Sequence, residues 1–529
     1  MERLIGKDGK WNIGIDKASF DNSKPMRFIS RFGIYITAAV LVLLNFVRIF
    51  DRVAWGDEAF AINAARLDMK GLFQVMYYGE NHPPLYYLIL KLCFAIFGDS
   101  IPVAHFSALL SYLVCVFIIL TFVRKHLGKG ASYFCLLIMS LGMDALTYNV
   151  EIRMYSVAFL CIFGCSICAY KVIKGEQKAW IPMTLWAVGA SYSHYFALAL
   201  CGLMLVVTAL FGAMRSGRKT FVNGIIAVLA MMAGFIPWYR YLFYQMKYVN
   251  GHFWIEEASG IKDIVKMLLG GERIWKLILV FFLIAAFLIK LIRFGFVRVF
   301  KENDGTEDIR ISAKGEHVRI SAVLKSRLSD KEMMSFVLFV SLLLCVAFGY
   351  GYSLIIRPIF IARYAYPMSA AVIFAASLLI SDIKDMADAS GLKAFNVKLI
   401  WGTVCAVMLI CIAVMGFKNY KDAKVEFDLQ KSMTEDVLTT IGTPDEDTIM
   451  VALNVPHMAW SVLECYYPDN EIESGWYFEH DWEKYWYFID ESIGSDGIAQ
   501  MESRGYEVRD CGYKMIAKYP CYLYYFEKK

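Results

Sequence analysis

The chain has 529 residues, of which 58% are hydrophobic and 19% are charged. A soluble domain is usually about half apolar and about a quarter charged, so this composition excludes an ordinary soluble protein and indicates a membrane protein. The net charge is only +5, and nothing in the sequence indicates a nucleic-acid partner. Residues 1–31 are mostly polar, and we expect the apolar run that follows to be an uncleaved anchor rather than a signal peptide.

Apolar segments that could cross a bilayer recur along the chain, and we count about 11 of them. They lie at 32–50, 102–123, 130–147, 151–173, 179–194, 196–214, 220–242, 275–292, 333–354, 359–380 and 397–416. Loops rich in Lys and Arg stay in the cytoplasm. Placing every basic cluster there predicts an α-helical, multi-pass protein of the plasma membrane, with a cytoplasmic N-terminus and an extracytoplasmic C-terminus.

The segment 83–98 is apolar but short, and it contains Lys91. Counting it as a span would place the basic residues of 124–129 outside the cell, against the charge rule. We therefore predict that residues 51–101 form one long outer loop with helices lying in the membrane interface. A loop of this length in a compact protein is usually functional or disordered, and this one is too apolar for disorder.

The sequence predicts a cytoplasmic segment at 1–27, a membrane domain at 28–416 and a mobile cytoplasmic loop at 293–332. Residues 420–529 have a soluble character. Strands are expected at Asp447–Asn454, Tyr485–Asp490, Tyr513–Lys518 and Cys521–Phe526, with helices at His457–Cys465 and Gly497–Arg504. This alternation predicts a small extracytoplasmic α/β domain. Its three cysteines, Cys465, Cys511 and Cys521, allow at most one disulfide.

Two carboxylates, Asp57 and Glu58, follow the first span closely. Acids in outer loops are often merely solvated. Here the pair lies between Trp55 and Phe60, where partial burial could tune a carboxylate for proton transfer. Neighbouring residues on a helix point in different directions, so one acid could face a substrate while the other caps the helix or forms an ion pair.

The fourth span begins with a second polar group, Glu151, Arg153 and Tyr155. Charged residues at this depth face a protein cavity or pair with one another. A structural Glu–Arg pair that holds the first loop and a role in substrate binding are both consistent with this pattern.

Further polar residues lie on the predicted outer side. His194 occupies a tight turn between two apolar runs, where a structural role is the simpler explanation. Together with Glu80, His82 and His252 it could form a divalent-metal site, although the spacing does not show that these side chains converge.

Two arginines, Arg357 and Arg363, flank the outer ends of later spans, and Tyr364 follows the second. Such arginines can reach toward lipid head groups, or they can bind a phosphate with their planar guanidinium groups.

Taken together, these motifs resemble membrane glycosyltransferases of the GT-C class, in particular the protein O-mannosyltransferase and aminoarabinose-transferase family. The residues that carry the resemblance are Asp57-Glu58, the block His82-Pro83-Pro84-Leu85-Tyr86-Tyr87, Glu151-x-Arg153-x-Tyr155, His194-Tyr195 and Arg363-Tyr364. The resemblance covers residues 28–416.

The resemblance implies a polyprenyl-phosphate sugar donor, an acceptor hydroxyl on a glycan, lipid or protein, and inversion at the anomeric carbon. By position it implies that Asp57 is the base, Glu58 its supporting acid and Glu80 a residue that holds metal or acceptor. Arg153 and Arg363 then become candidates for binding the donor phosphate. Some members of the family place a lysine close to the Pro-Pro pair, whereas this chain has Asn81 and His82 there, which argues against phosphate binding by a lysine at this point.

Two other functions fit the same composition. A transporter or flippase for a lipid-linked sugar would need ionisable residues near mid-bilayer, and these are scarce. A scaffold that displays residues 420–529 would leave the first loop unexplained. A cavity that joins Asp57, Arg153 and Arg363 to the outer interface would favour the enzyme.

Overall fold

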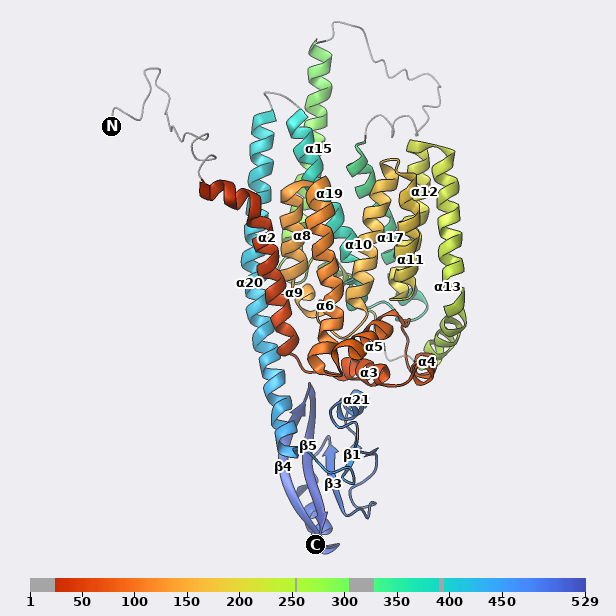
Figure 1. The fold of residues 1–529 in the computed structure, drawn as a ribbon, viewed down its shortest axis with the longest axis vertical. Helices are drawn as coiled ribbons and strands as arrows, with labels where there is room; N and C mark the ends of the chain where they lie inside the picture. Colours follow the sequence, from red (N-terminus) through yellow and green to blue (C-terminus); the bar gives the residue numbers. More distant parts are fainter. Residues whose placement is uncertain (1–23, 253–254, 304–327, 390–393) are drawn as a thin grey trace, which may run out of the picture.

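The computed structural model describes residues 24–252, 255–303, 328–389 and 394–529. It consists of a helical bundle with a small sheet domain at one end, which we call the domain end (Figure 1). The bundle helices are α2 (Lys24–Val47), α6 (Ile101–Ile118), α7 (Arg124–His126), α8 (Gly128–Leu141), α9 (Met143–Tyr148), α10 (Tyr155–Ile173), α11 (Trp180–Ser191), α12 (Tyr195–Ser216), α13 (Arg218–His252), α14 (Ile261–Leu268), α15 (Trp275–Asn303), α17 (Asp330–Ile355), α18 (Ala362–Ala365), α19 (Ser369–Ala389) and α20 (Ala394–Ile441).

Seven helical segments of the described residues are long and apolar enough to cross a membrane. They are Arg31–Phe50, Ile101–His126, Tyr155–Ile173, Tyr195–Ser216, Arg218–Lys247, Asp330–Ile355 and Leu399–Ile441. Three shorter apolar helices are Leu85–Phe97, Gly128–Leu141 and Trp275–Ile289. The helical membrane protein predicted from the sequence is therefore confirmed, while the number of 11 spans is not.

The first loop folds into α3 (Gly56–Arg66), α4 (Met69–Tyr78) and α5 (Leu85–Phe97), which lie across the domain end of the bundle (Figure 1). The N-terminus of α4 is capped by Asp68, whose carboxylate accepts a hydrogen bond from the backbone of Gly71. Pro84 precedes α5, where its fixed φ and missing N–H suit a helix start. The loop thus contains the helices that its apolar pattern predicts.

Several predicted boundaries differ from the structure. The segment 1–27 ends inside α2, which already begins at Lys24, and the loop 293–332 is shortened because α15 continues to Asn303 and α17 begins at Asp330. Residues 1–23 and 304–327 lie outside the described residues. The boundary near residue 418 falls inside α20, which is one continuous helix of 48 residues. The polar second half of this helix carries only a narrow apolar stripe, formed by Ala423, Phe427, Val437 and Ile441 and interrupted by Gln430 and Thr434.

The sheet domain has the strand order β2-β1-β3-β5-β4. Its elements are β1 (Ile449–Leu453), α21 (His457–Tyr466), β2 (Ile472–Glu473), β3 (Lys484–Ile489), α22 (Gly494–Ser503), β4 (Tyr506–Ile516) and β5 (Tyr519–Lys528). The β1–β2 and β1–β3 pairs are parallel, and β5 pairs antiparallel with β3 and β4. The predicted α/β domain is therefore present, and Cys465, Cys511 and Cys521 are free thiols.

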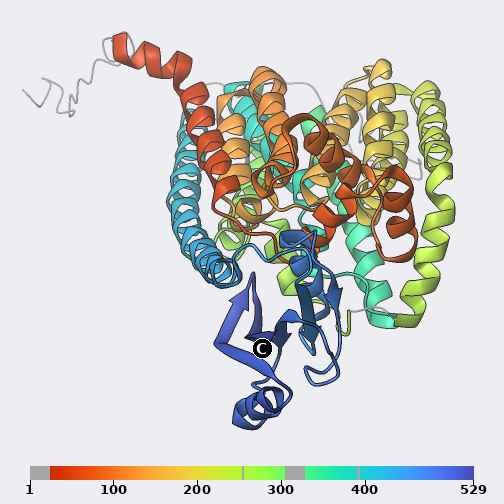
Figure 2. The same cartoon turned by 60° about the horizontal axis from the view of Figure 1, so that its bottom comes forward.

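The two faces of the sheet belong to different cores. Met450, Trp486 and Leu523 pack into the same continuous core as the bundle helices. Val451, Tyr487 and Phe526 point to the opposite face and form a separate aromatic cluster with α22. Because side chains alternate along a strand, one sheet can join the bundle and keep a core of its own. Figure 2 shows the domain in front of the red and orange first-loop segments.

Candidate functional site

The acidic pair of the first loop opens α3. Trp55 precedes this helix in an extended conformation, and Asp57 and Glu58 occupy its first turn, where negative charge is favoured by the helix dipole. The Glu58 carboxylate accepts a hydrogen bond from the backbone N–H of Trp55 at 3.3 Å. The helix start therefore fixes both acids, and the rotation of about 100° per residue sends them to different surroundings.

Glu58 points inward and is completely buried. Its Oε1 accepts a hydrogen bond from the backbone N–H of Ile152 at 2.9 Å and lies 3.3 Å from Nη2 of Arg52. His105 lies behind it, with Nδ1 3.8 Å from Oε1. These contacts fasten the first loop to the segment ahead of α10. They leave Glu58 with no direct access to a substrate.

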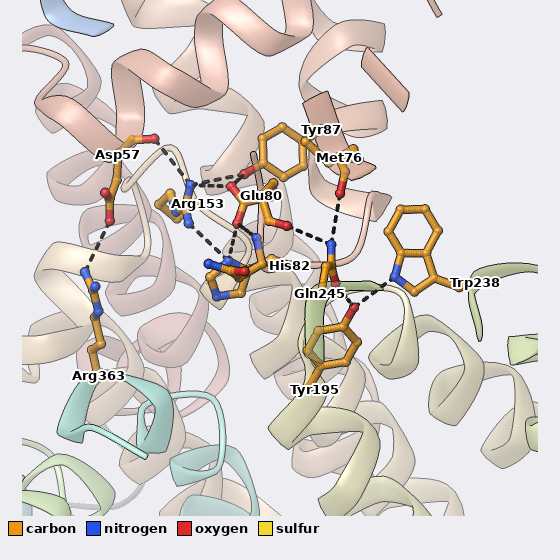
Figure 3. A network of polar contacts seen from close by, with 11 residues as sticks. Asp57, Met76, Glu80, His82, Tyr87, Arg153, Tyr195, Trp238, Gln245 and Arg363 are labelled. Carbon is orange, nitrogen blue, oxygen red and sulfur yellow. Dashed lines mark hydrogen bonds and ion pairs between the residues drawn. The ribbon is translucent and has the colours of Figure 1, made fainter. Parts of the chain in front are cut away.

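Asp57 points toward the open side of the site, with its side chain 20% exposed. Its Oδ2 lies 3.2 Å from Nη1 of Arg363, and its backbone carbonyl accepts a hydrogen bond of 3.4 Å from Arg153 (Figure 3). Asp57, Arg153 and Arg363, which come from three distant parts of the chain, thus meet in one place.

Glu80 holds Arg153 from the other side (Figure 3). Nη1 of Arg153 lies 3.3 Å from Oε2 of Glu80 and donates to the hydroxyl of Tyr87 at 3.1 Å. That hydroxyl donates in turn to Glu80, and Nδ1 of His82 lies 2.5 Å from Oε1 of Glu80. Gln245 donates to the backbone carbonyls of Met76 and Glu80 and ties α13 to the loop. With these partners, the two oxygens of Glu80 are occupied by protein donors.

Two of the buried acids near these arginines, Glu80 and Glu151, differ in their electrostatics. Burial opposes ionisation of Glu80, but the charges of Arg153 and His82 outweigh it and hold the pKa of Glu80 well below its usual value. Burial raises the pKa of Glu151 to about 7, and the neighbouring charge of Glu58 adds to the increase. The surroundings therefore favour the ionised form of Glu80 and the protonated form of Glu151.

His82 and His194 lie beside an apolar cavity of about 290 Å³. Their rings are 5.4 Å apart, and the Tyr364 ring lies 4.9 Å from that of His194. The rest of the lining comes from α12, α13, α17 and the segment after α17, and includes Phe196, Ala199, Leu242, Met246, Phe348, Tyr352 and Ile359. One end of this cavity is therefore polar and adjoins the arginine cluster, while its walls are hydrocarbon and aromatic rings.

His194 carries an unused donor at this cavity. Its Nδ1 accepts a hydrogen bond from the backbone N–H of Phe196 at 3.2 Å, so a neutral ring carries its proton on Nε2. Burial lowers the pKa of His194, and His82 lowers it further, which favours the neutral ring. Nε2 is buried and has no hydrogen-bond partner among the described residues.

Two predicted residues lie at different distances from this cluster. Tyr155 is buried at the start of α10, with its ring 5.9 Å from that of His194. Arg357 lies between α17 and α18, and no hydrogen bond or ion pair of the described residues joins its side chain to the cluster.

The metal hypothesis finds no support in the described residues, which contain no group of three His, Cys, Asp or Glu side chains suited to a metal ion. Glu80 is saturated by Arg153, His82 and Tyr87, while His194 faces the apolar cavity. The side chain of His252 lies outside the described residues.

Some important residues were missed in the sequence. Arg52 neutralises Glu58, Tyr87 links Glu80 to Arg153, and Gln245 joins α13 to the first loop. An isolated glutamine or arginine at the end of an apolar run is a usable signal. Its partner cannot be assigned from spacing, because the contacts join residues far apart in the chain.

Comparisons with known proteins agree with this architecture. Residues 81–240 match the model of the dolichyl-phosphate-mannose-protein mannosyltransferase family. No curated protein matches the chain. Crystal structures of ArnT from Cupriavidus metallidurans, in the apo state and bound to undecaprenyl phosphate, both superpose with a TM-score of 0.56 at 12% identity. Each alignment covers 93% of this chain and 98% of ArnT. The resemblance predicted from the motifs is thus confirmed: the chain has the fold of ArnT, and its residues 81–240 match the mannosyltransferase family.

Proposed function

We propose that this protein is a membrane glycosyltransferase that moves a sugar from a polyprenyl-phosphate donor to an acceptor hydroxyl. Asp57 is the base, and the sugar is transferred with inversion. The observation that carries the proposal is the meeting of an accessible carboxylate and two arginines beside His82, which together with His194 lines the polar end of an apolar cavity.

Asp57 suits the base because it is held without being buried. Its partner Arg363 keeps it oriented, and the 20% exposure of its side chain leaves room for an acceptor hydroxyl. Glu58 supports it from behind by fixing the start of α3. An adjacent pair of acids thus divides into one that meets the substrate and one that holds the helix.

The donor phosphate fits the polar end of the cavity. Nε2 of His194 lacks a protein partner, and a buried donor without one is costly unless a ligand satisfies it. Arg153 and Arg363 supply positive charge beside it, and His82 and Tyr364 complete the lining. A phosphate would accept from His194 and be stabilised by the arginines as its charge grows on leaving.

The lipid tail fits the rest of the cavity. The walls from α12, α13 and α17 are apolar and include Phe196, Met246 and Phe348. Each of these helices is long and apolar enough to span a membrane, so a chain lying between them stays in hydrocarbon. ArnT has the same fold, and its crystal structure bound to undecaprenyl phosphate supports a ligand of this class.

The reaction follows from these positions. The acceptor oxygen attacks the anomeric carbon while Asp57 takes its proton. The bond between that carbon and the phosphate oxygen breaks, and the electron pair leaves with the polyprenyl phosphate. The carbon acquires positive character in the transition state, which the nearby carboxylate stabilises. The attack and the departure take place on opposite faces of the sugar, so the configuration inverts.

We place the site at the outer face of the plasma membrane, because the positive-inside rule puts the first loop and the C-terminal domain there. Both lie at the domain end of the bundle (Figure 1). An acceptor on a glycan, a lipid or a protein would approach from that side.

The test uses the full chain reconstituted in lipid, with a panel of polyprenyl-phosphate sugars and crude envelope acceptors. Release of free polyprenyl phosphate is followed for the wild type, Asp57→Asn and the matched control Asp68→Asn. Asp68 is an acid of the same loop that only caps α4. We expect release by the wild type and the control, and a rate lower by about 10² to 10⁴-fold for Asp57→Asn.

The other outcomes separate the competing functions. Full activity of Asp57→Asn would refute the base. Donor binding without release, even with envelope acceptors, would refute the transferase and favour a transporter of lipid-linked sugars. Absence of donor binding altogether would favour a scaffold.

A further inference from the structure

The hairpin between β4 and β5 brings the C-terminal domain into contact with the acidic pair. Nζ of Lys518 lies 3.4 Å from the centroid of the Trp55 ring, directly ahead of α3. The hydroxyl of Tyr519 lies against Gly56, since a Cβ atom at that glycine would stand 2.3 Å from the hydroxyl oxygen. The tip of a soluble-like domain thus touches the two residues that precede Asp57.

The hairpin tip is held in a specific conformation. Ala517 adopts a φ of 55°, which is unfavourable for a residue with a Cβ. Its side chain is buried, and its N–H donates to Thr434 on α20 at 2.9 Å. Lys514 of the same hairpin forms an ion pair of 2.6 Å with Asp436, also on α20. The long helix therefore fixes the place where Lys518 and Tyr519 project.

Helix α21 binds the rest of α3. The hydroxyl of Tyr466 accepts a hydrogen bond of 3.2 Å from the N–H of Ala54. Asn63 donates to the carbonyl of Ser461 at 3.0 Å, and Arg66 donates to that of Cys465 at 2.9 Å. The segment Ala54–Arg66 is thus enclosed between the bundle and the C-terminal domain over its whole length.

Charged and titratable groups from several elements surround Asp57. Arg363 pairs with Asp57 directly, and Arg153 lies on its backbone. Glu58 and Glu151 add negative charge nearby. The tyrosines that interact electrostatically with Asp57 are Tyr87, Tyr364 and Tyr519. Lys518, on the hairpin, is a further positive group beside the residue that precedes α3.

We propose that the β4–β5 hairpin tip is a positioning element of the transferase site: Tyr519 holds Gly56 and Lys518 holds the Trp55 ring, so that the start of α3 presents Asp57 to the substrate. This inference rests on the proposed function only in assigning the base. The docking of the hairpin on Trp55 and Gly56 is independent of any reaction. The C-terminal domain then acts on catalysis without touching the reacting atoms.

The first measurement is kcat and KM for the reconstituted full chain. We expect Lys518→Met to lower kcat about tenfold with little change in the donor KM, because the cation over the Trp55 ring is lost and Asp57 is less well placed. Lys518→Arg keeps a cation over that ring and should restore the wild-type kcat. Lys528→Met removes a lysine from the far end of β5 that pairs with Asp481, and should leave kcat unchanged. A wild-type kcat for Lys518→Met would overturn the role of Lys518.

The second measurement needs no activity. Amide hydrogen exchange over residues 54–66 should become about tenfold faster in Tyr519→Ala and less so in Tyr519→Phe, which keeps the ring and decides the case if the first variant misfolds. Lys528→Met serves again as the control. Unchanged exchange in both tyrosine variants would overturn the positioning role, whatever the activity shows. Retained activity of Asp57→Asn would instead refute the proposed function alone.

Discussion

Replacing Glu58 by alanine tests the division of labour between the adjacent acids. The substitution removes a carboxylate that is completely buried and that accepts from the backbone N–H groups of Trp55 and Ile152. It also strands Arg52, whose side chain is only 4% exposed. In the variant, Arg52 still donates to the carbonyl of Thr147 and still lies over the face of the Phe427 ring, but it has lost the counter-ion that Glu58 provided.

The expected cost follows from these contacts. Removing one partner of a buried ion pair costs about 3 to 5 kcal/mol, because the other charge stays buried without compensation. The matched variant is Asp57→Asn, in which the pair is more open, with side-chain exposures of 20% for Asp57 and 24% for Arg363. A partly exposed pair contributes less than about 1 kcal/mol. The stability effects of the two substitutions should therefore differ several-fold.

Thermal unfolding of the purified protein in detergent, followed by tryptophan fluorescence, measures the difference. We expect a clearly lower midpoint for Glu58→Ala and a near wild-type midpoint for Asp57→Asn. Limited trypsin digestion should also cut the first loop faster in Glu58→Ala, since Arg52 and Arg66 bracket the loosened helix start. A wild-type midpoint and wild-type digestion for Glu58→Ala would refute the structural assignment of Glu58.

Three further predictions concern the surrounding residues. Arg153→Met removes the main charge that keeps Glu80 ionised. In the wild type, the lowered pKa of Glu80 stabilises the fold above the pKa of the unfolded chain, and this stability is lost as the pH falls. The acid-unfolding midpoint of the variant should therefore move to higher pH, and an unchanged acid titration would contradict this. Glu151 has a raised pKa, so its contribution to stability is present below the unfolded value of about 4.5 and is lost as the pH rises to about 7. The stability of Glu151→Gln should therefore increase relative to that of the wild type as the pH rises across that window. A difference in unfolding midpoint that does not change with pH would count against this prediction. Gly56→Ala places a Cβ atom 2.3 Å from the hydroxyl of Tyr519 and 2.4 Å from Cβ of Met458, so it should displace the C-terminal domain and lower the rate of transfer about tenfold or more. Normal activity with an unchanged digestion pattern would show that the contact is unimportant.

The sequence alone determined the helical membrane character and the helices of the first loop. Both depend on local patterns, namely long apolar runs and a short apolar segment that begins at Pro83-Pro84 and ends at Gly98. It also predicted the strands and helices of the C-terminal domain in the right order, but missed β2, which has only two residues. A strand that short carries no alternation that a sequence pattern can reveal.

The continuity of α20 was decided by tertiary structure. Its apolar stretch ends near residue 416, and the remaining polar turns gain their order from contacts with the hairpin, such as those of Thr434 and Asp436. Most helical stability in proteins comes from packing rather than from propensity. A polar helix held by a partner domain therefore looks like a loop in the sequence.

At the site, the acidic pair likewise shows what the sequence alone cannot decide. The residue pattern alone singled out Asp57 and Glu58 but did not tell them apart, because they are neighbours of similar chemistry; only the family resemblance assigned the base to Asp57. The fold separated them by bringing Arg52 and Ile152 to one and Arg363 to the other. Lys518 reaches Trp55 from the far end of the chain. Local pattern thus determined which residue types lie at the membrane interface, while long-range packing decided which charges face one another.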